Sequence, residues 1–272
     1  MTDLASLGVS HLSGAVPAEL RARLQSQIDT WVEHFDPQEH RAVFTSDGAH
    51  LENQTYFLAS ARNVSCFLEA GAVDAQGQLT CDKHRAINKI GHALHDYSEA
   101  FAELARLPAF AKHLAQRGAQ AWELMQTMVI MKPPHIGGQV NWHQDGTFLI
   151  DQQQGCLGIW IALEDADSGN GCLQFGPSQP LSQRMETDHA SGQTQFVELG
   201  TPSVNAPETP IFAPCQAGDA VVFDGLTPHA SAPNTSALSR RAITLHFKPA
   251  DSEWLPCNWL QRGELPRFLV NA

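Results

Sequence analysis

The chain predicts a mainly β fold with a layer of helices on its N-terminal side. From about residue 126 to residue 250, short apolar segments alternate with turns, which is typical of a β-sandwich or β-barrel. Before that, at about 17–125, segments with the helical period alternate with irregular ones. No repeat, low-complexity tract or linker divides the 272 residues, so we expect a single domain spanning 1–272.

Residues 17–35 predict the first helix. Pro17 suits a first helical turn, and Pro37 stops the helix. Between them, apolar residues recur with the helical period at Leu20, Leu24, Ile28, Trp31, Val32 and Phe35. A His-x-Asp pair, His34 and Asp36, lies at the end of this helix. Side chains two residues apart on a helix point roughly 200° apart, so this pair is not expected to bind a metal.

The next segments predict a mixture of short elements. Residues 39–83 are expected to be irregular, with β-prone pieces at 54–58 and 64–68 and a hairpin turn at 74–77. Alternation in 87–95 puts Ile87, Lys89 and Gly91 on one side, and on this basis alone Lys89 is interpreted as a surface lysine of an edge strand. Residues 98–125 predict helix, interrupted at Pro108, and the apolar run 125–131 predicts a strand.

The second half predicts four more strands. They are expected at 156–163, 172–175, 220–225 and 242–247. Residues 181–210 are polar and predict a long loop.

Composition limits the partners of this protein. The net charge is −12, with only 17 Lys and Arg, which disfavours nucleic acid and anionic membranes. Six scattered cysteines without a Cys-x-x-Cys pair are typical of free thiols in a reducing compartment. We see no signal peptide and no apolar run long enough to span a bilayer. We therefore expect a cytoplasmic enzyme that acts on a small molecule as a monomer or weak dimer.

Residues 141–146, Asn-Trp-His-Gln-Asp-Gly, are interpreted as a strand end that presents two metal ligands. Strand alternation puts His143 and Asp145 on one face and Gln144 on the other. Gly146 lets the backbone bend directly after the second ligand. One further histidine would complete a facial triad of two His and one carboxylate, which leaves coordination positions open on an oxygen-activating iron(II).

The candidate for the third ligand is His229, which follows the strand at 220–223. A hairpin that turns near residues 234–236 would place Arg240 beside Ser231 and close to His229. A buried arginine implies a carboxylate or phosphate partner, and alternation sends Arg241 to the opposite face. From these residues alone, a facial-triad metal site and a metal-free β-sandwich are about equally supported.

Other histidines are expected not to bind metal. They are His135, His189 and His246, and the last of these is predicted to face the sheet or its surface. Thirteen histidines make chance His-x-Asp pairs easy to find, as His34 shows.

In combination, these motifs resemble the phytanoyl-CoA dioxygenase family of iron(II)- and 2-oxoglutarate-dependent oxygenases. The resemblance covers about residues 40–265. It is carried by the segments 142–145, 157–162, 170–173 and 229–247, with further similarity at 87–95 and 258–261.

The resemblance implies a double-stranded β-helix (jelly roll, cupin-like) core at about 126–250, with flanking N-terminal helices. It implies His143, Asp145 and His229 as iron ligands, with Arg240 binding the far carboxylate of 2-oxoglutarate. It also assigns a further set of residues to the cosubstrate pocket, and for the first of them this replaces the surface interpretation. That set is Lys89, Met128, Gln144, Trp160 and Ser231.

The implied reaction uses O2, decarboxylates 2-oxoglutarate to succinate and CO2, and hydroxylates a small-molecule substrate. Asp145 favours hydroxylation, because related halogenases have a small residue at that position, which leaves room for chloride. Two alternatives stay open at this point. One is a catalytically silent jelly-roll protein that binds metal and 2-oxoglutarate as a sensor or scaffold. The other is a zinc hydrolase or isomerase, against which the pair Arg240 and Ser231 argues.

The substrate is expected to be small and neutral or cationic. Acyl-CoA phosphates favour clustered Lys and Arg, and apart from Arg240 and Arg241 this acidic chain shows no such cluster. The polar segment 181–210 is expected to shape the mouth of the site.

Overall fold

Two mostly antiparallel sheets face each other across a cavity in the computed structural model, which describes residues 3–40, 42–44, 54–152 and 156–271. The larger sheet has the order β1 (Ser10–Leu12), β12 (Ala220–Asp224), β7 (Leu157–Ala162), β14 (Arg240–Pro249), β5 (Ala121–Lys132), β4 (Ile87–His92), β3 (Val64–Glu69) and β2 (Val43–Phe44), with β15 (Leu269–Asn271) beside β5. The smaller sheet has the order β11 (Ile211–Ala213), β8 (Leu173–Phe175), β13 (His229–Ser231) and β6 (Val140–His143).

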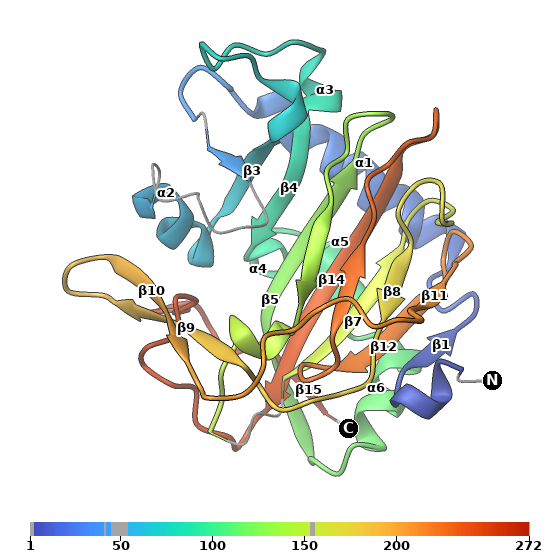
Figure 1. Ribbon diagram of the computed structural model, residues 1–272, viewed down its shortest axis with the longest axis vertical. Helices are drawn as coiled ribbons and strands as arrows, with labels where there is room; N and C mark the ends of the chain where they lie inside the picture. The colour runs from blue at the N-terminus through green and yellow to red at the C-terminus, as the bar shows by residue number, and fades with distance from the viewer. Residues whose placement is uncertain (1–2, 41, 45–53, 153–155, 272) are drawn as a thin grey trace.

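Helices α1 (Ala18–His34), α5 (Glu99–Ala105) and α6 (Pro108–Ala115) cover the outer face of the larger sheet, whereas α2 (Gln54–Ala59) borders the cavity (Figure 1). The other α-helices are α3 (Lys83–Ala86) and α4 (Leu94–Tyr97). Short 3-10 turns are η1 (Ala5–Leu7), η3 (Ser60–Arg62), η4 (Ala70–Ala72) and η5 (Asp145–Thr147). None of the helices among these described residues is long and apolar enough to cross a bilayer.

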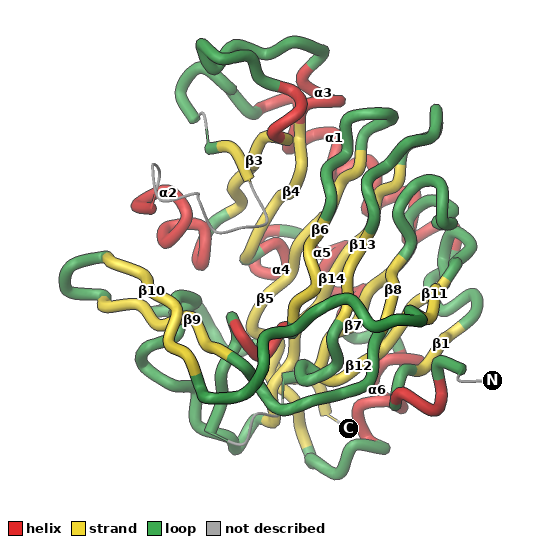
Figure 2. The backbone as a smooth tube through the Cα atoms, viewed as in Figure 1, coloured by secondary structure: helices red, strands yellow, loops and turns green. Residues whose placement is uncertain are grey.

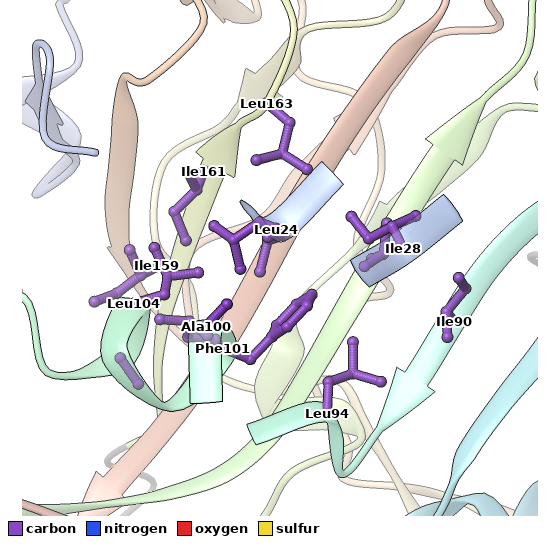
Figure 3. Close-up of a cluster of buried hydrophobic side chains, with 14 of the residues drawn as sticks. Leu24, Ile28, Ile90, Leu94, Ala100, Phe101, Leu104, Ile159, Ile161 and Leu163 are labelled. Carbon is purple, nitrogen blue, oxygen red and sulfur yellow. The ribbon is translucent and has the colours of Figure 1, made fainter. Parts of the chain in front are cut away.

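The main core lies between the helices and the larger sheet. In Figure 3, Leu24 of α1 and Leu104 of α5 lie beside Ile159 and Ile161 of β7. All of these side chains are fully buried. Burying such side chains contributes about 1.5–3 kcal/mol each, so this interface fixes the sheet against the helical layer.

Strand alternation decides which side chains reach the cavity. Along β7, β14 and β5, one set of alternate side chains packs against the helices; it includes Ile159, Ile161 and Leu245. The residues between them point to the other face and line the cavity. This set comprises Gly158, Trp160, Arg240, Thr244, His246, Gln126, Met128 and Ile130.

A polar hairpin forms a separate two-stranded sheet, β9 (Gln183–Asp188) and β10 (Gln193–Glu198). It projects from the body of the molecule (Figure 2). The expectation of a loop at 181–210 was therefore wrong over these strands. Their side chains are mostly polar. Only Met185 and Thr187 of β9 are buried and β10 has no buried residue, so the apolar alternation that identifies a strand is missing. The segment does line the mouth of the cavity, as expected, through Met185 and Phe196.

Two other boundaries differ from the sequence prediction. Residues 54–58 form helix α2 rather than a β-prone piece, and within it Phe57 stacks on Trp259 with 4.3 Å between ring centroids. The helical prediction for 98–125 was wrong at its end, because β5 begins at Ala121. There β5 pairs with β15 near the C-terminus, a partner that local sequence does not reveal. All six cysteines have free thiols, as expected.

Candidate active site

The predicted triad is assembled between the two sheets. Ligand atoms of His143, Asp145 and His229 all lie within 4.8 Å of one another. Strands β6 and β13 pair in a register that sets His143 opposite His229, with 4.2 Å between their ring centroids. The Nε2 atoms of His143 and His229 lie 3.7 and 3.6 Å from Oδ1 of Asp145. The pairing thus brings together two histidines that are far apart in sequence.

Asp145 is not part of the strand that carries His143. Strand β6 ends at His143, and Asp145 opens the 3-10 turn η5. The prediction of two ligands on one strand is corrected in this respect. The chain leaves the sheet because the N–H of Gly146 donates to the carbonyl of Gly225 at 2.9 Å. A Cβ on Gly146 would lie 3.2 Å from that carbonyl oxygen, so glycine suits this close approach.

Backbone carbonyls set the tautomers of both triad histidines. Nδ1 of His143 lies 2.8 Å from the carbonyl oxygen of Asn141, and Nδ1 of His229 lies 3.0 Å from that of Thr227. A carbonyl only accepts, so each Nδ1 donates and each Nε2 lone pair faces Asp145. Burial, together with the neighbouring His143, lowers the pKa of His229 to about 4. This imidazole is therefore neutral at neutral pH, as a metal ligand must be.

His246 holds the second oxygen of the triad carboxylate. Its Nε2 donates a hydrogen bond to Oδ2 of Asp145 at 3.1 Å. The other carboxylate oxygen, Oδ1, therefore faces the two triad histidines. His246 is buried and lines the cavity, so the prediction that it faces the sheet or its surface was wrong. Burial alone would raise the pKa of Asp145, but His246 and His229 more than offset burial and keep the pKa below its ordinary value.

Gly158 makes room for that carboxylate. A Cβ at this position would lie 3.1 Å from Oδ2 of Asp145 and 3.1 Å from the ring of Phe223. The residue lies on the cavity face of β7, beside His246 in the pairing of β7 with β14. Sequence analysis did not single out Gly158, because nothing local in the sequence shows what approaches it.

A cavity of about 670 Å³ contains most of the predicted site residues. It is lined by His143, Asp145, His229, Arg240, Lys89, Met128, Trp160 and Ser231. Gln144 lies outside it. The Gln144 side chain is fully buried, and its Nε2 donates to the carbonyls of Gln179 and Leu226 at 2.7 and 2.8 Å. The structure therefore places Gln144 where it anchors the backbone behind the triad.

Arg240 is a buried cation with open donors. It is 1% exposed, and its Nη2 donates to the hydroxyl of Ser231 at 3.4 Å. Its Nε and Nη1 have no hydrogen-bond partner among the described residues, and its guanidinium lies 5.5 Å from the ring centre of Trp160. Burial lowers the pKa of Arg240 to about 10, so the group stays charged near neutral pH. A buried guanidinium with free N–H groups fits an anionic ligand such as a carboxylate.

The neighbouring arginine points the other way, as alternation predicts. Arg241 pairs with Asp29 of α1 at 2.8 Å and lies 3.9 Å from Glu164. Lys89 is not a surface residue: it is buried in β4, and its Nζ lies 5.1 Å from the ring centre of Phe67. Burial lowers the pKa of Lys89 to about 7.

A second group of potential ligands, His11, Cys215 and Asp219, also lies within 4.8 Å. Asp219 accepts from the backbone N–H groups of Gly14 and Gln216 at 2.8 and 2.9 Å. His11 Nε2 lies 3.2 Å from Oδ2 of Asp219. These contacts give the second group a structural role at the turn before β12.

Comparison with known proteins identifies the family of this chain. The sequence profile of the phytanoyl-CoA dioxygenase (PhyH) family matches residues 6–242. The Mus musculus phytanoyl-CoA dioxygenase domain-containing protein 1 is 36% identical over 269 residues, which cover 94% of this chain and 91% of that protein. The Caenorhabditis elegans homologue of that protein is 34% identical, covering 90% of this chain and 88% of its own length. An Arabidopsis thaliana phytanoyl-CoA dioxygenase is 31% identical, with 90% and 87% covered.

Solved structures share the fold at lower identity. The epimerase SnoN in complex with Fe3+, alpha ketoglutarate and nogalamycin RO has a TM-score of 0.60 at 17% identity, covering 93% of this chain and 84% of that chain. EctD from S. alaskensis with bound Fe has a TM-score of 0.58 at 19% identity, with 97% and 83% covered. These similarities confirm the jelly-roll core. The profile match and the curated relatives show that the chain belongs to the phytanoyl-CoA dioxygenase family.

Proposed function

We propose that this protein is an iron(II)- and 2-oxoglutarate-dependent oxygenase that uses O2 to hydroxylate a small-molecule substrate. 2-Oxoglutarate would be decarboxylated to succinate and CO2. The observation that carries the proposal is the presence, in one cavity, of a triad of two His and one carboxylate and of a buried arginine with open donors.

The donor set fits the metal. His143 and His229 turn their Nε2 lone pairs, and Asp145 turns Oδ1, toward one point. Two imidazoles and one carboxylate are the facial triad of non-haem iron(II) oxygenases, and they leave positions for cosubstrate and O2. These three residues would hold the ion, and His246 would keep Asp145 in place through Oδ2.

The unpartnered donors of Arg240 fit the cosubstrate. A buried charge without a partner is costly, so its Nε and Nη1 call for an anion. The far carboxylate of 2-oxoglutarate would accept from this guanidinium and from the Ser231 hydroxyl, beside the ring of Trp160. Met128 and Lys89 would line the remaining wall. When bound, iron and 2-oxoglutarate supply the oxidising chemistry, and the protein supplies orientation and a dry cavity.

Hydroxylation is the outcome that Asp145 favours. Its carboxylate occupies the third ligand position, which halogenases leave to chloride by carrying a small residue there. Because Gly158 has no side chain, the carboxylate can stay in this position without a clash.

Succinate formation tests the proposal. The purified protein, given Fe(II), 2-oxoglutarate and O2 with a small-molecule extract, should release succinate, and His229→Ala or Arg240→Ala should abolish it. Arg241→Ala is the matched control and should retain it, because Arg241 faces α1. Binding of both iron and 2-oxoglutarate without succinate from any extract would instead indicate a binding protein that performs no turnover.

A further inference from the structure

We propose that the substrate is an uncharged molecule that combines a flat apolar ring with a hydroxyl or amide group. The ring would lie against an aromatic wall that includes Trp259, and the polar group would bond to Gln126. This inference rests on the proposed function, because it assigns the part of the cavity that metal and cosubstrate do not use.

The aromatic wall lines part of the cavity. Phe57 of α2 and Trp259 stack with 4.3 Å between centroids and 26° between planes, and His92 meets Trp259 edge-on at 4.8 Å. Phe148 packs against the same buried cluster as Trp259 and lies 6.1 Å from His143, and Phe196 of the hairpin lies 6.2 Å from Phe148. All of these rings line the cavity, and rings that offer faces and edges to one cavity favour a flat apolar ligand.

Two polar side chains that line the cavity, Gln126 and Thr244, have a buried polar atom without a hydrogen-bond partner among the described residues and are not used by the proposed function. Gln126 is the one that can both donate and accept through an extended amide. It is 4% exposed, lines the cavity, and lies opposite His246 in the pairing of β5 with β14. Its Oε1 is buried and has no hydrogen-bond partner among the described residues. Buried polar groups are normally bonded, so this amide calls for a partner from a ligand. An amide both donates and accepts, as does a hydroxyl, so the two are complementary.

The charges around the cavity favour a neutral ligand. Of the described residues that line it, Asp145 is the acidic one, and Lys89 and Arg240 are the basic ones besides the histidines. Asp145 would be committed to the metal, so a cationic substrate would find no acidic partner. Arg240 and Lys89 would face the two carboxylates of 2-oxoglutarate. A charged substrate would therefore be buried without compensation, which is unfavourable.

The mouth also lacks the cations that phosphates require. No exposed lysine or arginine is among the described lining residues. Of the two charge types left open by the sequence, neutral and cationic, the structure favours the neutral one.

Four indole probes with the same ring and different side chains test this directly. All four share the indole ring and its N–H, and they differ in the side chain: tryptophol (a neutral alcohol), 3-ethylindole (no polar group on the side chain), tryptamine (a cation) and indole-3-propionate (an anion). Each is titrated by calorimetry, without O2, into protein loaded with Fe(II) and 2-oxoglutarate. We expect tryptophol to bind about tenfold more tightly than 3-ethylindole, which is the effect of one satisfied hydrogen bond. Both charged probes should bind more weakly than tryptophol.

Variants at positions 126 and 259 show which residues cause the preference for tryptophol. Gln126→Met, which keeps an unbranched side chain of similar length, should remove the advantage of tryptophol and leave 3-ethylindole within about twofold. Gln126→Leu gives a second test should the first variant fold poorly. Trp259→Leu should weaken both probes alike. Gln193→Met, at an exposed position on the hairpin, is the matched control and should change neither.

Three results would overturn the inference: a charged probe that binds most tightly, a tryptophol preference that survives in both Gln126 variants, or no binding by any probe. The visible absorption of the iron–2-oxoglutarate complex, recorded first, separates these results from failure of the proposed function. If that absorption forms and the probe ranking fails, only the substrate class is wrong. If it does not form, the proposed function itself is wrong.

Discussion

Replacing Arg240 with methionine keeps an unbranched buried side chain and removes the guanidinium. Arg240 is 1% exposed, and two of its three nitrogens have no partner among the described residues. A buried carboxylate that loses its charged partner costs about 3–5 kcal/mol. At about 1.4 kcal/mol per tenfold change, 2-oxoglutarate should bind roughly a hundredfold to several thousandfold more weakly.

The assay is calorimetric titration of 2-oxoglutarate into the metal-loaded variant without O2. Arg241→Met is the control, and it should cost less than about 1 kcal/mol of binding, because Arg241 pairs with Asp29 on the helical side. The free energy of unfolding of the ligand-free variant is a second measurement. With no ligand present, Arg240 is a buried charge whose hydrogen-bond partner among the described residues is Ser231 alone. Arg240→Met should therefore not lower the free energy of unfolding by more than about 1 kcal/mol.

Two results would refute this reasoning. Equal losses of 2-oxoglutarate affinity at positions 240 and 241 would mean that the guanidinium of Arg240 is not the anchor. A loss of several kcal/mol in the stability of free Arg240→Met would mean that the residue is structural, and that its weakened binding follows from damage to the fold.

Three further predictions concern the metal ligands and their surroundings. His143→Ala and His229→Ala should each lose the iron that the unmodified protein binds at one ion per chain, whereas His34→Ala, on the exposed end of α1, should keep it; elemental analysis of reconstituted protein decides this. Asp145→Ala should abolish hydroxylation yet retain part of the 2-oxoglutarate binding, because Arg240 holds the far end independently; calorimetry that finds no binding despite retained iron would contradict this. Gly158→Ala should lower iron affinity at least about tenfold, because its Cβ would press on Oδ2 of Asp145 at 3.1 Å. The overpacking should also cost about 1–3 kcal/mol of stability. An unchanged iron titration would show that the carboxylate shifts freely.

Local spacing suggested the triad, and the family resemblance selected it over a metal-free β-sandwich, which the residues alone supported equally well. His143 and Asp145 lie two residues apart, and His229 follows an apolar strand and precedes a turn. Alternation alone placed Arg240 and Arg241 on opposite faces, and the structure confirms this. The same rule reaches His246, because counting in twos from Arg240 along β14 keeps to the cavity face. Strand alternation alone therefore predicts that His246 faces the cavity.

Other features depend on contacts that the sequence does not display. Gly158 matters because Asp145 and Phe223 approach it from other segments. Residues 54–58 have β-prone side chains, yet they form α2, where Phe57 stacks on Trp259 some two hundred residues away in the chain. The family resemblance assigned Gln144 to the pocket, but its amide is bonded to the carbonyls of Gln179 and Leu226 behind the triad, on the face that strand alternation gives it. In each case a distant partner decides the outcome.

The hairpin of β9 and β10 has a consequence for how this protein could be diversified. Among the described strands, it pairs with none in the sheets that carry the triad. It contacts the rest of the chain through Met185, which packs in a buried cluster with Trp259, and through hydrogen bonds such as Gln54 to Thr194 at 2.9 Å and Thr187 to Cys257 at 2.8 Å. Its Met185 and Phe196 nevertheless border the cavity. Grafting the corresponding hairpin of a relative should therefore exchange the entrance while the catalytic centre keeps its geometry, which makes this segment a natural cassette for recombination and library design.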